Sequence, residues 1–145
     1  MQLFLQEQAF DPWALAGQFS SALNGAGAMV TFSGIVRDDG GLTQLEIEHY
    51  PNMSRPAIMA IMQEAQARFH LLDAMVIHRY GILAAGEVIM MVATAALHRR
   101  EAFEAAEYLM DYLKSRAPFW KKEYRAEGTF WVDAKDSDEA ALKRW

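Results

Sequence analysis

The segment 111–123, D-Y-L-K-S-R-A-P-F-W-K-K-E, joins the end of an amphipathic helix to a proline and then to paired lysines. Apolar residues before it recur at three- and four-residue spacing, which predicts a helix with one face in the core. That inward face is expected to consist of Phe103, Ala106, Leu109, Met110 and Leu113. Pro118 ends the helix, so Lys114 is predicted on its last turn.

The chain is expected to leave this helix as a strand, because the residue before a proline is pushed towards extended geometry. Alternate side chains of a strand point to the same side. Within 117–123, Phe119, Lys121 and Glu123 are therefore predicted to share a face. Lys114 and Lys121 lie on either side of the helix stop, and such a fixed lysine pair indicates a site.

Length and composition predict one globular domain over residues 1–145, because 52% of the residues are hydrophobic and nothing resembles a linker or repeat. No apolar run reaches the ~18 residues of a membrane span, and no signal peptide is recognisable, so the cytoplasm is the expected location. The chain has no cysteine. It therefore offers no disulfide, thiolate metal ligand or cysteine nucleophile, and any sulfur that it handles must arrive on another molecule.

The net charge of -5 argues against general nucleic-acid binding. Positive charge is nevertheless concentrated in the segment from His98 to Arg125. This segment holds seven of the fourteen lysines and arginines. Such a cluster suits a small anionic ligand. The alternative, which charge alone favours, is a solvated helix face of mixed charge.

Periodicity and turn residues predict an α+β fold with a mostly antiparallel sheet and helices inserted between the strands. The expected helices cover residues 12–21, 54–69, 99–116 and 137–145, the first capped by Asp11, the second by Ser54 and the last by Ser137. The expected strands cover residues 3–5, 28–36, 42–50, 74–80, 87–97, 119–124 and 129–133. Residues 28–36 and 42–50 are predicted to form one hairpin, and residues 119–124 and 129–133 a C-terminal one.

Further anion contacts are expected where a buried strand meets a helix start, at His98 and Arg99, because backbone N–H groups and the helix dipole favour an anion there. The alternative for His98 is that it only satisfies a backbone group. Arg37, in the turn after a strand, is another candidate anion contact, because a guanidinium group can bind phosphate through two parallel hydrogen bonds. His49 and His78 have no partner at metal-ligand spacing, so core or surface roles are favoured and no metal or cofactor is expected.

Helix geometry separates two of these candidates. Arg99 and Lys114 are fifteen residues apart, which at ~1.5 Å per residue is about 22 Å along one helix. One small ligand cannot touch both. If both groups serve one site, the simplest arrangement takes His98 and Arg99 from a second copy of the chain, which predicts a homodimer with composite sites.

Over nearly its whole length the sequence resembles the MoaE family, the large catalytic subunits of molybdopterin synthase. The resemblance rests on ordered motifs spread along the chain, and the sequence also closes on K-R-W. The motifs are V-T-F-S-G-I-V-R (30–37), L-E-I-E-H-Y-P-N-M (45–53), V-I-H-R-Y-G (76–81), H-R (98–99), A-F-E-A (102–105) and M-D-Y-L-K-S-R-A-P-F-W-K-K-E (110–123).

The resemblance implies a sulfurtransferase that inserts two dithiolene sulfurs into cyclic pyranopterin monophosphate, making molybdopterin in molybdenum cofactor biosynthesis. It implies an alpha/beta-hammerhead-like fold with a C-terminal β-hairpin. It also implies a partner, a small ubiquitin-like subunit of the MoaD type, whose C-terminal Gly-Gly thiocarboxylate supplies the sulfur. Two large subunits would form a central dimer flanked by two small ones.

By position, the resemblance assigns the catalytic lysine to Lys114, beside the thiocarboxylate, and a second functional lysine to Lys121. Lys121 would hold the pterin or its phosphate, with Lys122 and Glu123 completing that wall. The other substrate-binding positions are Ile35, Val36, Arg37, His98 and Arg99.

Two positions depart from the family pattern. Lys135, also a substrate-binding position, stands where the resemblance leads us to expect an arginine that reaches towards the substrate, so the charge is kept but the bidentate fork is lost. The turn after Arg37, D-D-G-G, is also unusually acidic. Two other readings stay open: a non-catalytic dimeric scaffold that only binds a ubiquitin-like protein, and a small phosphate-ligand binding protein.

Overall fold

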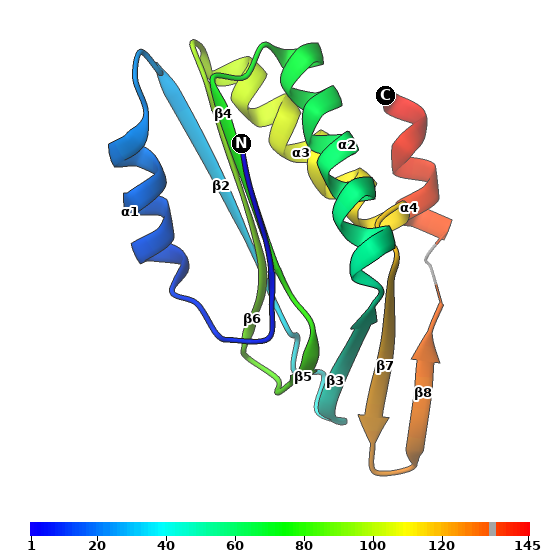
Figure 1. Ribbon diagram of the computed structural model, residues 1–145. Coiled ribbons are helices and arrows are strands. Elements are labelled where there is room, and N and C mark those ends of the chain that lie inside the picture. The colour runs from blue at the N-terminus through cyan, green and yellow to red at the C-terminus, as the bar shows by residue number, and fades with distance from the viewer. Residues whose placement is uncertain (134–135) are drawn as a thin grey trace.

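The computed structural model describes residues 1–133 and 136–145, which form two four-stranded sheets and the helices packed on them (Figure 1). The strands are β1 (Gln2–Gln6), β2 (Ala28–Ile35), β3 (Leu42–His49), β4 (Asp73–Arg79), β5 (Gly81–Leu83), β6 (Val88–Ala96), β7 (Phe119–Arg125) and β8 (Gly128–Val132). The helices are α1 (Pro12–Ala22), α2 (Pro51–Phe69), α3 (Arg99–Ser115) and α4 (Asp136–Ala141), followed by a 3-10 turn, η1 (Leu142–Arg144).

The first sheet has the strand order β1-β4-β6-β2 and the second β5-β3-β7-β8. β1 runs parallel to β4, and every other pairing in the described residues is antiparallel. The predicted α+β class with mostly antiparallel pairing is confirmed. So is the C-terminal hairpin, in which β7 pairs with β8.

The predicted hairpin between residues 28–36 and 42–50 is wrong, because β2 and β3 lie in different sheets. β2 pairs with β6, whereas β3 pairs with β5 and β7. Beyond β2, Val36 is buried and its backbone bonds to Glu87 and Gly86. The chain thus stays hydrogen-bonded to the first sheet for one residue beyond β2 before it crosses to the second sheet. Short β5, which β3 also pairs with, was not predicted.

Two predicted helix caps are also wrong. α2 begins at Pro51 with Tyr50 as its N-cap, since a proline with its fixed φ suits the first helical position. Ser54 therefore lies inside the helix, where its fully buried hydroxyl donates to the carbonyl of Tyr50 at 3.1 Å. At the C-terminus α4 begins at Asp136, so Ser137 is inside that helix. The cap of α1 by Asp11 is confirmed, because its carboxylate accepts from the N–H groups of Trp13 and Ala14.

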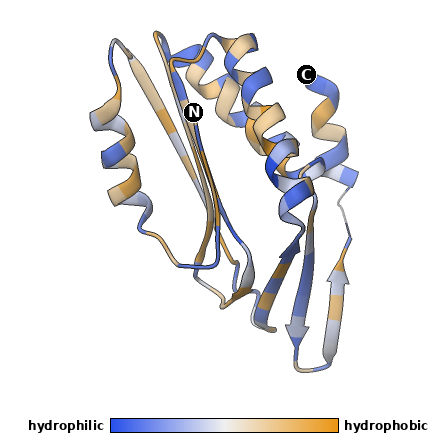
Figure 2. Cartoon of the chain, in the orientation of Figure 1, coloured by the Kyte–Doolittle hydropathy of each residue, from blue (hydrophilic) through white to orange (hydrophobic). Residues whose placement is uncertain are grey.

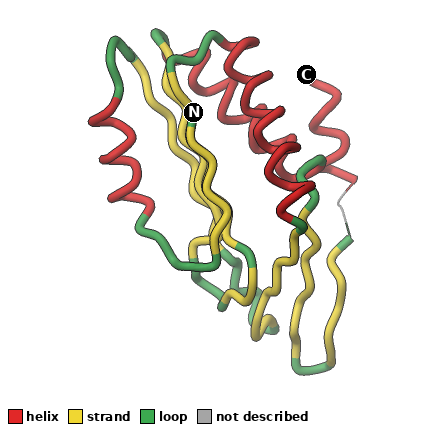
Figure 3. The backbone as a smooth tube through the Cα atoms, in the orientation of Figure 1, coloured by secondary structure: helices red, strands yellow, loops and turns green. Residues whose placement is uncertain are grey.

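The helices cover both faces of the first sheet, α1 on one side and α2 with α3 on the other (Figures 1 and 3). Apolar residues gather along this sheet, whereas β7 is mostly hydrophilic (Figure 2). The larger core lies between the first sheet and α2 and α3. A smaller one, around Phe19, lies under α1. No helix among the described residues is long and apolar enough to cross a membrane.

The inward face of α3 differs from the predicted one at Phe103, whose side chain is 62% exposed. The buried positions are Ala102, Ala105, Ala106, Tyr108, Leu109 and Leu113. Small residues in the first turns let the helix approach the sheet closely, and the hydroxyl of Thr94 donates to the carbonyl of Ala102 at 2.7 Å. Phe103 lies outside this close contact.

Candidate functional site

The two lysines singled out in the sequence lie on either side of the junction between α3 and β7. α3 ends at Ser115, with Arg116 as its C-cap, and β7 begins at Phe119. Lys114 is exposed on the last helical turn, as predicted. Lys121 is half-buried in the strand that follows. The predicted helix stop is thus confirmed, and the junction fixes the backbone of both lysines.

β7 lies between β3 and β8, and this position decides what Lys121 faces. Lys121 is opposite Ile47 of β3 and Val132 of β8. Ile47 is 1% exposed, so this face of the sheet is turned towards the core. Glu123 lies two residues further along the same face, as predicted from strand alternation.

Lys122 points to the opposite face of the second sheet. Its neighbours there are Glu46 and Trp131, and its ammonium nitrogen lies 5.2 Å from the centroid of the Trp131 ring and 5.5 Å from that of Tyr124. These distances are those of cation–π contacts. Within one chain, Lys122 therefore does not share a wall with Lys121.

The end of β2 and the loop after it carry three more of the proposed substrate contacts. Ile35 is 60% exposed, Val36 is buried and Arg37 is exposed. The loop is held at Asp39, whose carboxylate accepts from both terminal nitrogens of Arg125 and from the N–H groups of residues 41 and 42. The hydrogen bond from Arg125 is the main reason that the pKa of Asp39 falls to about 2. The acidic turn is thus matched by a cation from β7.

His98 and Arg99 lie at the opposite end of α3 from Lys114. His98 is the N-cap residue, its side chain makes no capping hydrogen bond, and both residues are exposed. The side chain of His98 therefore does not cap α3, and the alternative that it satisfies a backbone group at the strand end stays open. In Figure 1, α3 runs from the upper end of the first sheet to the start of β7, so one chain places the His98–Arg99 pair and the lysine pair apart.

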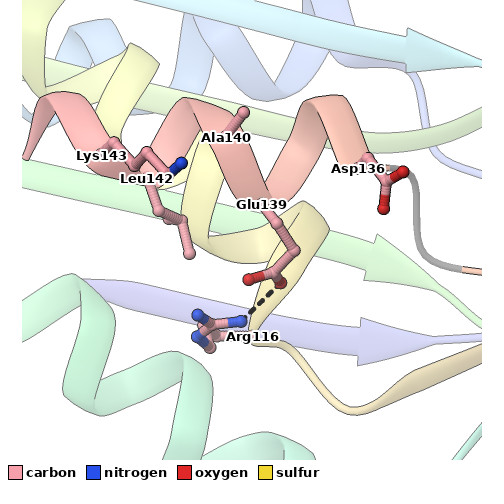
Figure 4. A pocket seen from close by; sticks show the side chains of 6 residues that line it. All are labelled: Arg116, Asp136, Glu139, Ala140, Leu142 and Lys143. Carbon is pink, nitrogen blue, oxygen red and sulfur yellow. Dashed lines mark hydrogen bonds and ion pairs between the residues drawn. The ribbon is translucent and has the colours of Figure 1, made fainter.

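A shallow pocket of about 420 Å³ lies beside the end of α3 (Figure 4). Arg116 forms an ion pair with Glu139 of α4 there, and Lys143 lines the same pocket. The last proposed contact, Lys135, lies outside the described residues. Among the described residues, no group of histidine and acidic side chains is placed to hold a metal ion.

The sequence did not identify two groups next to these candidates. One is the Asp39–Arg125 pair. The other is His78, predicted only as a core or surface residue, which is 5% exposed and stacks on Phe119. A histidine inside the predicted apolar strand 74–80 was the only sequence signal for His78. Asp39 and Arg125 are too far apart in sequence for their pairing to be predicted.

Comparison with known proteins gives one consistent family. Residues 5–116 match the family described as MoaE protein. The molybdopterin synthase catalytic subunit of Cereibacter sphaeroides is 60% identical, over all of both chains. The MoaE structure from Burkholderia ambifaria superposes with a TM-score of 0.86 at 42% identity, covering 99% of this chain and 97% of that one. A Helicobacter pylori chain, from a complex of subunits 1 and 2 of molybdopterin-converting factor, is 21% identical and superposes with a TM-score of 0.78. The match covers 92% of this chain and 91% of that one, and it shows a shared fold.

Proposed function

The chain belongs to the MoaE family of molybdopterin synthase catalytic subunits, and from this membership we propose that it converts cyclic pyranopterin monophosphate to molybdopterin. Two dithiolene sulfurs enter the substrate in this reaction, in molybdenum cofactor biosynthesis. They come from the C-terminal thiocarboxylate of a small ubiquitin-like subunit. A single catalytic domain over residues 1–145 and a location in the cytoplasm are part of the same proposal.

The observation that carries the proposal is the junction of α3 and β7, which holds Lys114 and Lys121 on rigid elements seven residues apart. A relative that is 60% identical over the full length is a catalytic subunit. The chain has no cysteine to carry sulfur itself, which agrees with delivery by a partner. The Helicobacter chain of the same fold comes from a complex with a second subunit, and this supports a partner of that kind.

In the proposed reaction the thiocarboxylate sulfur bonds to a carbon of the pterin side chain, and the bond from that carbon to its oxygen substituent breaks, so that the oxygen leaves with the electron pair. Water then cleaves the bond between that sulfur and the carbonyl carbon, and the small subunit leaves as a carboxylate. Lys114, exposed on the last turn of α3, stabilises the negative charge on the carboxyl group as it departs. Lys121 holds the pterin or its phosphate.

Two copies of the chain are needed to complete this site. His98 and Arg99 stand about 22 Å from Lys114 along α3, so they bind the anionic substrate at the site of the other copy. Ile35, Val36 and Arg37 supply the loop that meets the pterin, and Glu123 extends the Lys121 face. Lys122 points to the opposite face of the second sheet, so within one chain it does not complete the wall that holds the pterin. The assembly is a homodimer flanked by two small subunits.

The experiment that tests the proposal compares Lys114→Ala with the unaltered chain for turnover and for binding of the small subunit. We expect turnover to disappear while binding is nearly unchanged. A non-catalytic scaffold gives binding but no turnover with either chain. A plain phosphate-ligand binding protein gives tight pterin binding that does not depend on the small subunit.

A further inference from the structure

A column of aromatic rings crosses from the first sheet to the second at the start of β7. The ring of His78, on β4, stacks on that of Phe119, with centroids 4.1 Å apart and planes inclined by 14°. The ring centroid of His49, on β3, lies 5.9 Å from that of Phe119 and 4.3 Å from that of Tyr80. Three strands and the residue after β4 therefore meet through their rings.

His78 is neutral in this column. The ring is buried, and its Nδ1 lies 2.7 Å from the carbonyl oxygen of Arg79. A carbonyl only accepts, so Nδ1 carries the proton and Nε2 is unprotonated. The pKa of His78 is lowered to about 4, mainly by burial and to a smaller extent by electrostatic repulsion from Lys121 and His49, although the hydrogen bond to the carbonyl of Arg79 raises it. The column therefore contains no positive charge from His78 near neutral pH.

Lys121 is tied to the column through Phe119. The two residues are alternate positions of β7, so their side chains leave the same face roughly 7 Å apart. Lys121 also lies close enough for its charge to act on His78. Any displacement of the first residues of β7 thus moves Lys121 with them.

We propose that His78 is a positioning residue for Lys121. Its ring stacks on Phe119 and holds the start of β7 against the first sheet, and this contact sets where the ammonium group of Lys121 lies. The importance of that position for turnover rests on the proposed function, whereas the position itself can be measured separately. The alternative is a purely structural role, in which His78 only fills the core.

Two variants separate the ring from the rest of the side chain. His78→Phe and His78→Leu both lose the hydrogen bond to the carbonyl of Arg79, but only His78→Leu loses the stacked ring. The first measurement is trace acylation with acetic anhydride, read by peptide mass spectrometry as the labelling of Lys121 relative to Lys114. Lys114 is exposed on α3, outside the column, and serves as the internal reference.

We expect His78→Leu to raise the labelling of Lys121 relative to Lys114 by about two- to tenfold, the range that loss of one stacked ring pair gives. His78→Phe should keep the labelling ratio of the unaltered chain. The proposal is overturned if His78→Leu keeps that ratio, or if both variants raise it equally. Should His78→Leu fail to fold, Phe119→Leu removes the same stack from its other side and is read in the same way.

The second measurement is steady-state kinetics of the same variants in the complete synthase. We expect His78→Leu to lower kcat by roughly tenfold or more, because a small displacement of a positioned group is costly, while His78→Phe retains most of it. Equal kcat in both variants contradicts the positioning role. If the unaltered chain shows no turnover, the proposed function fails, and the labelling ratio still decides the position of Lys121.

Discussion

Asp39 and Arg125 form a two-point ion pair that fastens the loop after β2 to the far end of β7. Arg125 Nη1 donates to Asp39 Oδ1 at 3.1 Å, and Nη2 donates to Oδ2. Arg125 also donates from Nε to Glu123 at 2.8 Å. One guanidinium thus connects the loop of Arg37 with the face of β7 that carries Lys121.

Asp39→Asn should weaken substrate binding, because it removes the charge that holds this loop. We expect KM for the pterin to rise by about threefold to tenfold with kcat nearly unchanged, the pattern of a lost binding contact. Steady-state kinetics measures both. Asp38→Asn is the matched control, since the Asp38 carboxylate accepts from the N–H of Gly40 and an amide oxygen can do the same. Equal KM values in the two variants contradict a role for the ion pair.

Folding stability should depend on pH through His78. In the unfolded chain its pKa is near 6.5, and in the fold it is about 4, so between these values the unfolded state binds more protons. The stability that the neutral ring contributes is fully present above pH 6.5 and is lost as the pH falls towards 4. The free energy of unfolding should fall by on the order of 3 kcal/mol over this range.

Urea unfolding at a series of pH values measures this loss, and His78→Phe should remove most of it. His49 titrates in the same direction, because burial and the charge of Arg55 lower its pKa, so a smaller slope should remain. An unaltered pH profile in His78→Phe would show that the buried histidine is not the source.

The C-terminal tryptophan should stabilise the fold through α2 and α3. The indole N–H of Trp145 donates to Asp111 at 2.7 Å, and its ring packs edge-on against Phe69 and Tyr108. We expect Trp145→Ala to lower the free energy of unfolding by about 3 kcal/mol, the lower end of the range for a large aromatic side chain, because Trp145 is only half-buried. Trp13→Ala is the control, since Trp13 is 83% exposed and its removal should change stability by about 0.5 kcal/mol or less. Equal losses in urea unfolding would contradict the packing role.

Composite sites should allow two inactive variants to complement each other. Lys114→Ala and Arg99→Ala chains, each inactive alone, are mixed and allowed to exchange subunits. Half of the dimers are then mixed, and each of these has one intact site, so the mixture should recover about a quarter of full activity. If each site belonged to a single chain, mixing would restore nothing.

Local signals in the sequence predicted the part of the fold that carries the lysines. Pro118 and the periodicity before it fix the junction of α3 and β7, because both act over a few residues. The partner of a strand is a non-local choice, and so alternation identified β2 and β3 without revealing that they lie in different sheets. Phe103 was misplaced because apolar character alone does not tell which residues make the closest approach to the sheet.

The sequence proposed the site residues one by one, and their roles stay a prediction; it did not reveal how they are arranged in space. Strand alternation, which placed Lys121 and Glu123 on one face, also puts Lys122 on the other, yet the resemblance grouped all three. The ring column around Phe119 joins three strands and was not visible in the sequence. The separation of Arg99 from Lys114 followed from helix geometry alone, because α3 is unbroken between them.

Sulfur transfer from a partner, the reaction proposed for this chain, can be tested by following the sulfur itself. The small subunit is prepared with a radiolabelled thiocarboxylate and mixed with the purified chain and cyclic pyranopterin monophosphate. We predict two labelled sulfurs in each molecule of molybdopterin formed, and none with Lys114→Ala. Label that remains on the small subunit, in a complex that has formed with the unaltered chain, would contradict the proposed sulfur transfer.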